Sequence, residues 1–328
     1  MDVKLRQLAK CTQAITRCVQ TVEDGVAQEA CVAKAKGKCT AVLERELVLA
    51  RTKLGETIAE RCGGVEFVPS IVDARLGLGY ERVAATCATQ FDVPKFDELK
   101  DVSACVEAAH ACWAERLFDL VEPRAQELLT RAGIAAELRS TLGCVGERPG
   151  AGGGVEDKAK LGRPLTRCSA ALKRAAARFA ARKQAALGRC VTAAFVCEQS
   201  KQADASCEAR AVETCTRALT RAAGERPRLS AVSRRACDGV PYAALLDARG
   251  IGLGALETEC ADYGVDGIGG DFTQYAACLM QHHECRAEEL VAIEMPRAAE
   301  LFETLGAAGL NPALQFPNPI CPVASPAP

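Results

Sequence analysis

Three histidines, His110, His282 and His283, are the residues of this chain best suited to acid–base or metal chemistry. Histidine is the most common general base and a frequent metal ligand. His110 and His283 share a local pattern, in which a cysteine lies five residues before the histidine and another two residues after it. On a helix, residues two apart point to different faces, so a metal shared by such a histidine and cysteine is geometrically awkward. We therefore expect structural histidines near disulfides and keep His110 and His283 as weak candidates for a metal held between two domains.

Other catalytic patterns are missing from the sequence. No GxSxG motif occurs, and the glycine pairs near residues 77 and 252 lack the preceding strand and the third glycine of a phosphate-binding loop. We expect those glycines to supply positive φ between helices. Two kinds of arginine recur, in Pro-Arg-Ala and in Asp-Ala-Arg, and would bind an anion or form local ion pairs on exposed helix faces. The residues concerned are Arg124, Arg297, Arg75 and Arg249, with Glu127, Glu300, Asp73 and Asp247 nearby. The sequence predicts no catalytic or cofactor-binding residue and no enzyme.

Nineteen cysteines are the dominant chemical feature. Zinc and iron–sulfur sites usually draw ligands from CxxC spacings, and neither CxxC nor CxxCH occurs. The cysteines instead recur seven or eight residues apart, as Cys11 and Cys18 or Cys31 and Cys39 do, which places both sulfurs on one helix face. This spacing favours disulfides between helices and an oxidising compartment. Thiolate handling of Cu(I) stays open as an alternative.

The six cysteines from Cys168 to Cys237 have a regular arrangement. Paired from the outside in, the two residue numbers of each pair have a nearly constant sum, as facing residues of an antiparallel helical hairpin would. The same holds near the N-terminus. The predicted pairs are Cys168–Cys237, Cys190–Cys215, Cys197–Cys207, Cys11–Cys39 and Cys18–Cys31.

The chain reads as a tandem duplication. The segments 105–127 and 278–300 align without a gap and share Cys, His, Cys, Glu and Pro-Arg-Ala at equivalent positions. We therefore predict an all-α protein with two duplicated domains, 1–145 and 165–328, separated by a flexible glycine- and proline-rich linker at 146–164 and ending in a proline-rich tail.

Each copy should contain a disulfide-stapled hairpin and a further long helix. The hairpin helices are expected at about 3–22 and 26–61, and at about 165–199 and 204–236, the last with a kink or short break near Pro227. The long helix, at about 97–132 and 272–306, contains Pro123 or Pro296, so it is either kinked or divided into two consecutive helices.

The remaining cysteines leave several connectivities open. We prefer Cys260–Cys278 with Cys285–Cys321, and by equivalence Cys87–Cys105 with Cys112–Cys144. Cys62 then has no partner. In the second copy the equivalent of Cys62 is predicted to pair with Cys168. The matching cysteine of the first copy would lie about twelve residues before Met1, so we expect an upstream segment. A bond from Cys62 to another protomer and a free thiol are the alternatives.

Composition excludes several classes. The net charge of −1 and the 4% of aromatic residues argue against nucleic-acid binding. No apolar run reaches the length of a membrane span, and the first ten residues, MDVKLRQLAK, lack the continuous apolar core of a signal peptide.

The phrases HHECRAEEL…MPRAAELF and AHACWAERL…EPRAQELL resemble a loose group of uncharacterised, cysteine-rich helical repeat proteins of bacteria, which are usually predicted to be exported. The resemblance implies export and disulfides, and carries no activity or functional residues. We therefore expect a non-enzymatic, extracellular or periplasmic scaffold. It would be a structural subunit of a surface, matrix or filament, or a binding module, whose partner is a second copy or another surface protein. The alternatives are a Cu(I)-handling bundle and an enzyme with a site between the repeats.

Overall fold

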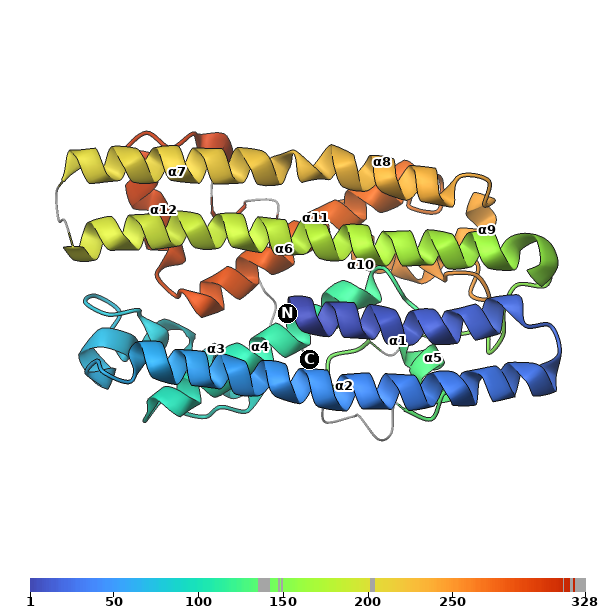
Figure 1. Cartoon of the computed structure of the whole chain (residues 1–328). Coiled ribbons are helices and arrows are strands. Elements are labelled where there is room, and N and C mark those ends of the chain that lie inside the picture. Colours follow the sequence, from blue (N-terminus) through green and yellow to red (C-terminus); the bar gives the residue numbers. More distant parts are fainter. Residues whose placement is uncertain are drawn as a thin grey trace. The chain divides into compact units, whose positions relative to one another are not determined.

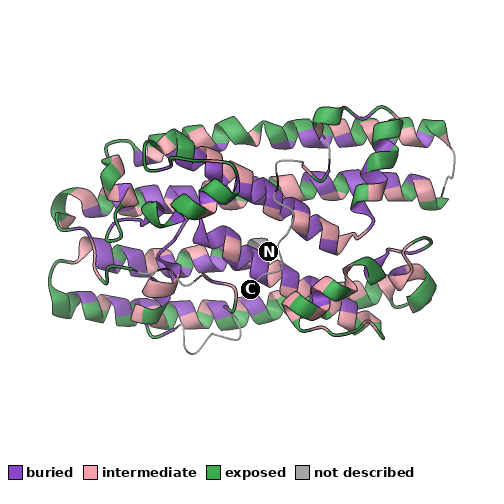
Figure 2. Ribbon diagram, turned by 180° about the vertical axis from the view of Figure 1, so that it is seen from behind, coloured by how far each residue is buried: buried purple, intermediate pink, exposed green. Residues whose placement is uncertain are grey.

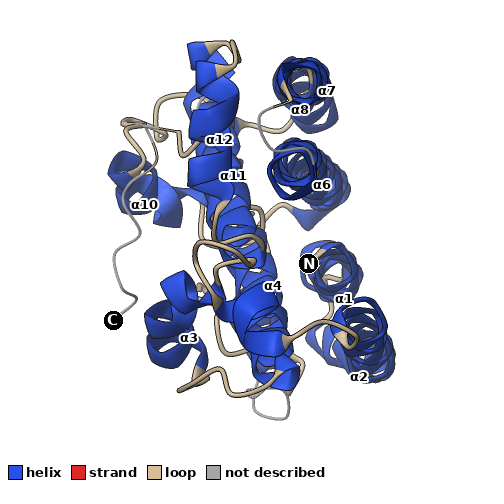
Figure 3. Cartoon of the chain, turned by 90° about the vertical axis from the view of Figure 1, so that its left-hand side faces the viewer, coloured by secondary structure: helices blue, strands red, loops and turns tan. Residues whose placement is uncertain are grey.

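The computed structural model describes residues 1–134, 142–146, 148, 150–200, 204–314, 316–318 and 321. Within these residues every regular element is a helix and no strand occurs (Figure 3). The predicted all-α class is therefore confirmed. None of the described helices combines the length and the hydropathy of a membrane span.

The first hairpin consists of α1 (Asp2–Thr21) and α2 (Gly25–Cys62), which run antiparallel (Figure 1). Leu5, Leu8, Ile15 and Val19 of α1 are buried at three-, four- and seven-residue intervals, which is the pattern of one helix face. Between the helices, Asp24 accepts a hydrogen bond from the backbone N–H of Ala27 at 2.7 Å and so caps the first turn of α2.

The second hairpin has α6 (Arg163–Ser200) as its first arm, and α7 (Ala205–Ala223) followed by α8 (Glu225–Cys237) as its return arm. Asp204 begins α7, because its carboxylate accepts hydrogen bonds from the backbone N–H groups of Ser206 and Cys207. Helix α7 ends before Gly224, and Pro227 lies in the first turn of α8, where a missing N–H costs little. Of the turn between α6 and α7, residues 201–203 lie outside the described residues.

The long third helix is two consecutive helices in each half of the chain. Helix α4 (Leu99–Asp119) is followed by α5 (Ala125–Arg131), and α11 (Phe272–Glu294) by α12 (Ala298–Ala307). Pro123 and Pro296 lie in the breaks, where proline can neither donate a backbone hydrogen bond nor continue the preceding helix. Of the two options that the sequence left open, the structure shows the division.

Short helices connect these elements. Between α2 and α4 lie η1 (Val68–Val72), η2 (Tyr80–Val83) and α3 (Ala84–Phe91). Between α8 and α11 lie α9 (Tyr242–Leu246), η4 (Leu253–Leu256) and α10 (Glu257–Asp262). Helix η3 (Lys158–Gly162) precedes α6, and η5 (Pro312–Leu314) follows α12.

The chain forms two compact units whose boundaries fall inside long helices. Unit 1 comprises residues 1–50, 111–178 and 227–283, and unit 2 comprises 51–110, 179–226 and 284–328. Each unit therefore contains segments from both halves of the sequence, and cuts across the division at 146–164 that the sequence suggested.

Each unit has its own buried residues, drawn in purple in Figure 2. In unit 2, one face of α6 and α7 packs on α12, with Leu187, Leu219, Leu301 and Phe302 among the buried residues. A smaller cluster in the same unit surrounds Tyr80. In unit 1, Leu8, Ile15, Leu117, Phe118 and Leu172 are almost completely buried.

Nine disulfides join eighteen of the nineteen cysteines, and each lies within one unit. Unit 1 contains Cys11–Cys39, Cys18–Cys31, Cys112–Cys144, Cys168–Cys237 and Cys260–Cys278. Unit 2 contains Cys87–Cys105, Cys190–Cys215, Cys197–Cys207 and Cys285–Cys321. Their Cα–Cα distances, from 4.5 Å for Cys190–Cys215 to 5.7 Å for Cys197–Cys207, are ordinary for disulfides. Cys62 is unpaired and half-buried beside the Tyr80 cluster.

The glycine-rich segment after residue 150 is docked on unit 1. Val155 donates its backbone N–H to Gln20 Oε1 at 3.0 Å, and Lys158 Nζ donates to the carbonyl of Val22 at 2.8 Å. Gly154 lies so close to Val19 that a Cβ at this position would overlap the Val19 carbonyl. Part of the segment predicted as a linker thus packs on the rest of unit 1, and glycine at position 154 permits the close approach. The proline-rich tail after Cys321 lies outside the described residues.

Candidate functional site

The two histidines that the sequence singled out lie in different units and have separate surroundings. His110 belongs to unit 2, where its Nε2 lies 2.6 Å from Glu294 Oε1. His283 belongs to unit 1 and is almost completely buried. Burial, reinforced by the neighbouring His282, lowers the pKa of His283 to about 3, so this side chain is neutral at physiological pH. Among the described residues, no group of three or more histidine, cysteine, aspartate or glutamate side chains is arranged to hold a metal.

The third histidine, His282, is part of a chain of polar side chains in unit 1 that is buried at His282 and Asp119 and partly exposed at Glu259 and Arg148. His282 Nε2 lies 3.0 Å from Glu259 Oε1, and its ring packs on Tyr263 with a centroid distance of 4.2 Å. Glu259 also pairs with Arg148, which in turn lies 3.7 Å from Asp119. Burial raises the pKa of Asp119 to about 8 against the opposing effect of Arg148. Burial also acts to raise the pKa of Glu259, but His282 and Arg148 outweigh it and lower that pKa to about 2. This chain joins helices α4, α10 and α11 within one unit.

The Pro-Arg-Ala arginines are buried structural residues, which corrects their expected place on exposed helix faces. The Arg124 side chain is 4% exposed and donates to the carbonyls of Arg249 at 2.7 Å and Gly250 at 3.0 Å. The Arg297 side chain is 1% exposed and donates to the carbonyl of Gly77 at 3.2 Å. Both also form the expected local ion pair, with Glu127 and Glu300, each at 2.7 Å. Neither guanidinium is therefore free to bind a ligand.

These contacts also show which glycines occupy equivalent positions in the two halves of the sequence. Gly79 and Gly252 both have φ of +84°, and a Cβ on either would approach the side chain of Arg297 or Arg124 to about 3 Å. Gly252 thus matches Gly79. Positive φ is confirmed for one glycine of each turn, and the second reason for glycine is the close approach of an arginine.

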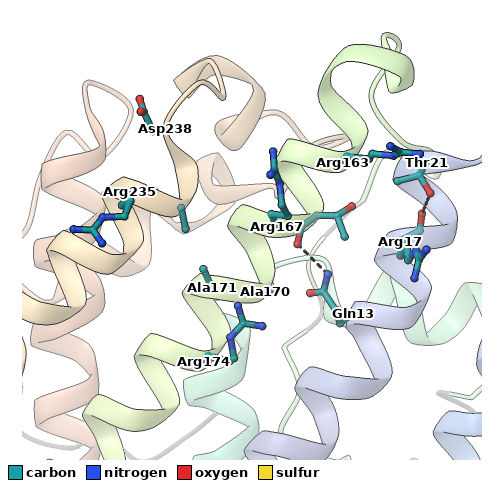
Figure 4. Close-up of a pocket in the computed structure, with 12 residues that line it drawn as sticks. Gln13, Arg17, Thr21, Arg163, Arg167, Ala170, Ala171, Arg174, Arg235 and Asp238 are labelled. Carbon is teal, nitrogen blue, oxygen red and sulfur yellow. Dashed lines mark hydrogen bonds between the residues drawn. The ribbon is translucent and has the colours of Figure 1, made fainter.

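The best candidate site is a groove in unit 1 lined by arginines. It has a volume of about 1160 Å³ and lies between α1, α6 and α8. Figure 4 shows Arg163, Arg167 and Arg174 along α6, with Arg17 on α1 and Arg235 on α8. All five arginines are exposed, and Asp238 is the only carboxylate among the lining residues that the structure describes.

The arginines of α6 form one stripe along the groove. Positions 163, 167 and 174 fall on one helix face, since their spacings of four and seven residues are close to whole turns. At a rise of 1.5 Å per residue, the stripe extends for about 16 Å. Within the described part of the chain, none of the five guanidinium groups forms an ion pair or a hydrogen bond with another residue.

The walls of the groove are held by polar contacts between α1 and α6. Gln13 donates its Nε2 to the carbonyl of Thr166 at 2.9 Å (Figure 4). Beneath it, Lys173 pairs with Glu122 and contacts Thr12 Oγ1 at 3.2 Å, with Lys173 and Glu122 almost completely buried. Burial lowers the pKa of Lys173, and its partner Glu122 opposes that shift. The buried ion pair therefore attaches α6 to the segment between α4 and α5, while the bonds of Gln13 and Thr12 attach α6 to α1.

Sequence reasoning missed this groove. The stripe at residues 163, 167 and 174 is visible in the sequence, but an arginine-rich exposed face is common on helices. The approach of Arg17 and Arg235 depends on tertiary packing, and no local pattern signals it.

Comparisons of this chain with family models, with curated proteins and with solved structures found no match. Nine disulfides fit an extracellular or periplasmic compartment. The function of the protein must therefore be inferred from the geometry of the molecule.

Proposed function

We propose that this protein is a non-enzymatic, exported scaffold, stapled by disulfides and acting as a structural subunit or a binding module. The observation that carries the proposal is the distribution of disulfides. Every one of α1, α2, α4, α6, α7, α8, α10 and α11 carries at least one cysteine in a disulfide. Each such bond typically contributes about 2–4 kcal/mol.

The arrangement of the charged residues supports a scaffold. Arg124, Arg297 and the Lys173–Glu122 pair are buried and bonded to neighbouring groups. The histidines lie against carboxylates or within the core. These are the surroundings of groups that hold a fold together, and acid–base catalysis needs a group within reach of a substrate.

We also propose that the two halves arose by tandem duplication. Three equivalences support it: the contacts of Arg124 with Gly250 match those of Arg297 with Gly77, Gly79 and Gly252 share one φ value, and Cys87–Cys105 and Cys260–Cys278 both join residues 18 apart. The arginine of each half contacts the turn of the other half. Duplicated halves that exchange segments in this way would give two similar units.

The test against Cu(I) handling is a competition titration. Purified protein, prepared without reductant, is titrated against a colorimetric Cu(I) chelator of known affinity. The scaffold removes no more than one equivalent of Cu(I) from the chelator, and a thiol-based carrier removes several. Removal of several equivalents under these conditions would contradict the scaffold.

A further inference from the structure

We propose that the arginine groove of unit 1 binds a linear anionic polysaccharide whose charges are sulfate or phosphate esters. The site consists of the five groove arginines already named, on α1, α6 and α8. Nothing in the proposed scaffold function requires such a groove. The inference depends on that proposal only for the compartment in which the ligand is met.

The charge of the groove is local. The whole chain has a net charge of −1, yet five arginines and one aspartate line this surface. Like charges brought together repel, and carboxylates nearby would ordinarily neutralise them. Since no described residue pairs with these guanidinium groups, an external anion is the group that completes the site. Arginine presents a planar fork of donors that fits the oxygens of sulfate and phosphate groups.

The dimensions favour a polymer over a small ion. The arginine stripe on α6 extends for about 16 Å, and Arg17 and Arg235 flank it on the two walls (Figure 4). The volume of the groove, about 1160 Å³, exceeds the range of about 300–1,000 Å³ that is usual for small-molecule pockets. Charges spaced along a chain would meet several guanidinium groups at once.

The lining favours a polysaccharide over single-stranded nucleic acid. Single-stranded DNA and RNA are held by aromatic side chains on which bases stack. The described lining residues are arginine, alanine, threonine, glutamine and aspartate, with no aromatic ring among them. A surface with guanidinium groups and small side chains recognises charge spacing alone.

The experiment measures binding of the full chain to a size-defined, fluorescently labelled heparin oligosaccharide at several salt concentrations. We expect binding at a low salt concentration of about 50 mM, and this binding should weaken steeply as salt rises because counterions are released. The variant Arg167→Ala/Arg174→Ala should bind at least about tenfold more weakly, with a salt slope lower by about one per contact removed. The variant Arg167→Lys/Arg174→Lys, which keeps both charges, should recover part of the affinity.

The matched control is Arg45→Ala/Arg217→Ala. It removes the same charge from exposed helix positions outside the groove, where the side chains are 75% and 58% exposed. We expect it to bind like the parent protein, and all variants should keep the parent's circular dichroism spectrum. Equal weakening of both double variants would show diffuse charge attraction and overturn the proposal. So would the absence of binding at low salt, or tighter binding of a DNA strand of equal charge. None of these outcomes depends on the number of free thiols, so failure here is distinct from failure of the scaffold.

Discussion

At the scale of single residues, the arginines of this protein include buried ones bonded to backbone carbonyls and carboxylates, and exposed ones in the groove for which no described partner is found. Arg124 and Arg297 belong to the first class, and the groove arginines, such as Arg167, to the second. Charged side chains are seldom fully buried unless they are paired. The contrast separates arginines that maintain the fold from arginines that remain available to a ligand.

His283 should make stability depend on pH in the acid range. Its pKa falls from 6.5 in the unfolded chain to about 3 in the folded protein, so its contribution is complete above pH 6.5 and is lost as pH falls toward 3. Replacement by glutamine, His283→Gln, removes this titrating group and its pH-dependent contribution to stability. Between pH 7 and pH 4 the parent should lose more unfolding free energy than the variant, by roughly 3 kcal/mol.

Urea unfolding at a series of pH values checks this expectation. The comparison variant is His110→Gln, which removes a histidine whose side chain is 18% exposed. Parallel stability curves for the parent and His283→Gln between pH 7 and pH 4 would contradict a contribution of His283 to the pH dependence.

At the scale of elements, the turns with Gly79 and Gly252 depend on glycine for two reasons at once. The backbone is left-handed there, and an arginine side chain packs against the space that a Cβ would occupy. A left-handed conformation costs a non-glycine residue about 1–2 kcal/mol. The close contact adds to that cost.

Gly79→Ala should therefore lower the melting temperature, through a loss of about 2 kcal/mol or more. The matched control is Gly188→Ala in the middle of α6, where a Cβ would meet nothing within 4 Å. That change should stabilise by about 0.5–1 kcal/mol, because alanine is the better helix former. Differential scanning calorimetry measures both, and equal melting temperatures for the two variants would be inconsistent with the strained turn.

Helices could be predicted from the sequence because each presents apolar residues at three- and four-residue intervals, as Leu5, Leu8 and Ile15 do in α1. The breaks near Pro123 and Pro296 have a local cause, the proline itself, so the sequence predicted either a kink or a division at these positions. Contacts between distant segments had no such cause. Neither the docking of Gly154 on Val19 nor the bond from Arg124 to Gly250 leaves a periodic pattern, and the groove depends on packing of that kind.

At the scale of the whole molecule, each unit draws on both halves of the sequence. No disulfide joins residues before 146 to residues after 164, since the nine pairs fall within one half or the other. The two halves are therefore linked covalently only through the main chain of residues 146–164. Their association is otherwise non-covalent.

Cleavage of that connection should leave the two halves together. A protease site inserted at Ala151, which is exposed, can be cut in the folded protein. Because each unit needs segments from both halves, the cut protein should elute at the volume of the parent in size-exclusion chromatography. Addition of denaturant should then separate two fragments. Elution as two smaller species without denaturant would mean that the halves fold independently.

The disulfide-stapled scaffold depends most on the state of the cysteines, and intact mass measures that state directly. The protein is purified without reductant, unfolded in denaturant and treated with an alkylating reagent. With nine disulfides and Cys62 unpaired, the mass should rise by one adduct, and by nineteen after prior reduction. Peptide mapping should place the single adduct on Cys62. A mass increase by many adducts before reduction would contradict the disulfide-stapled scaffold.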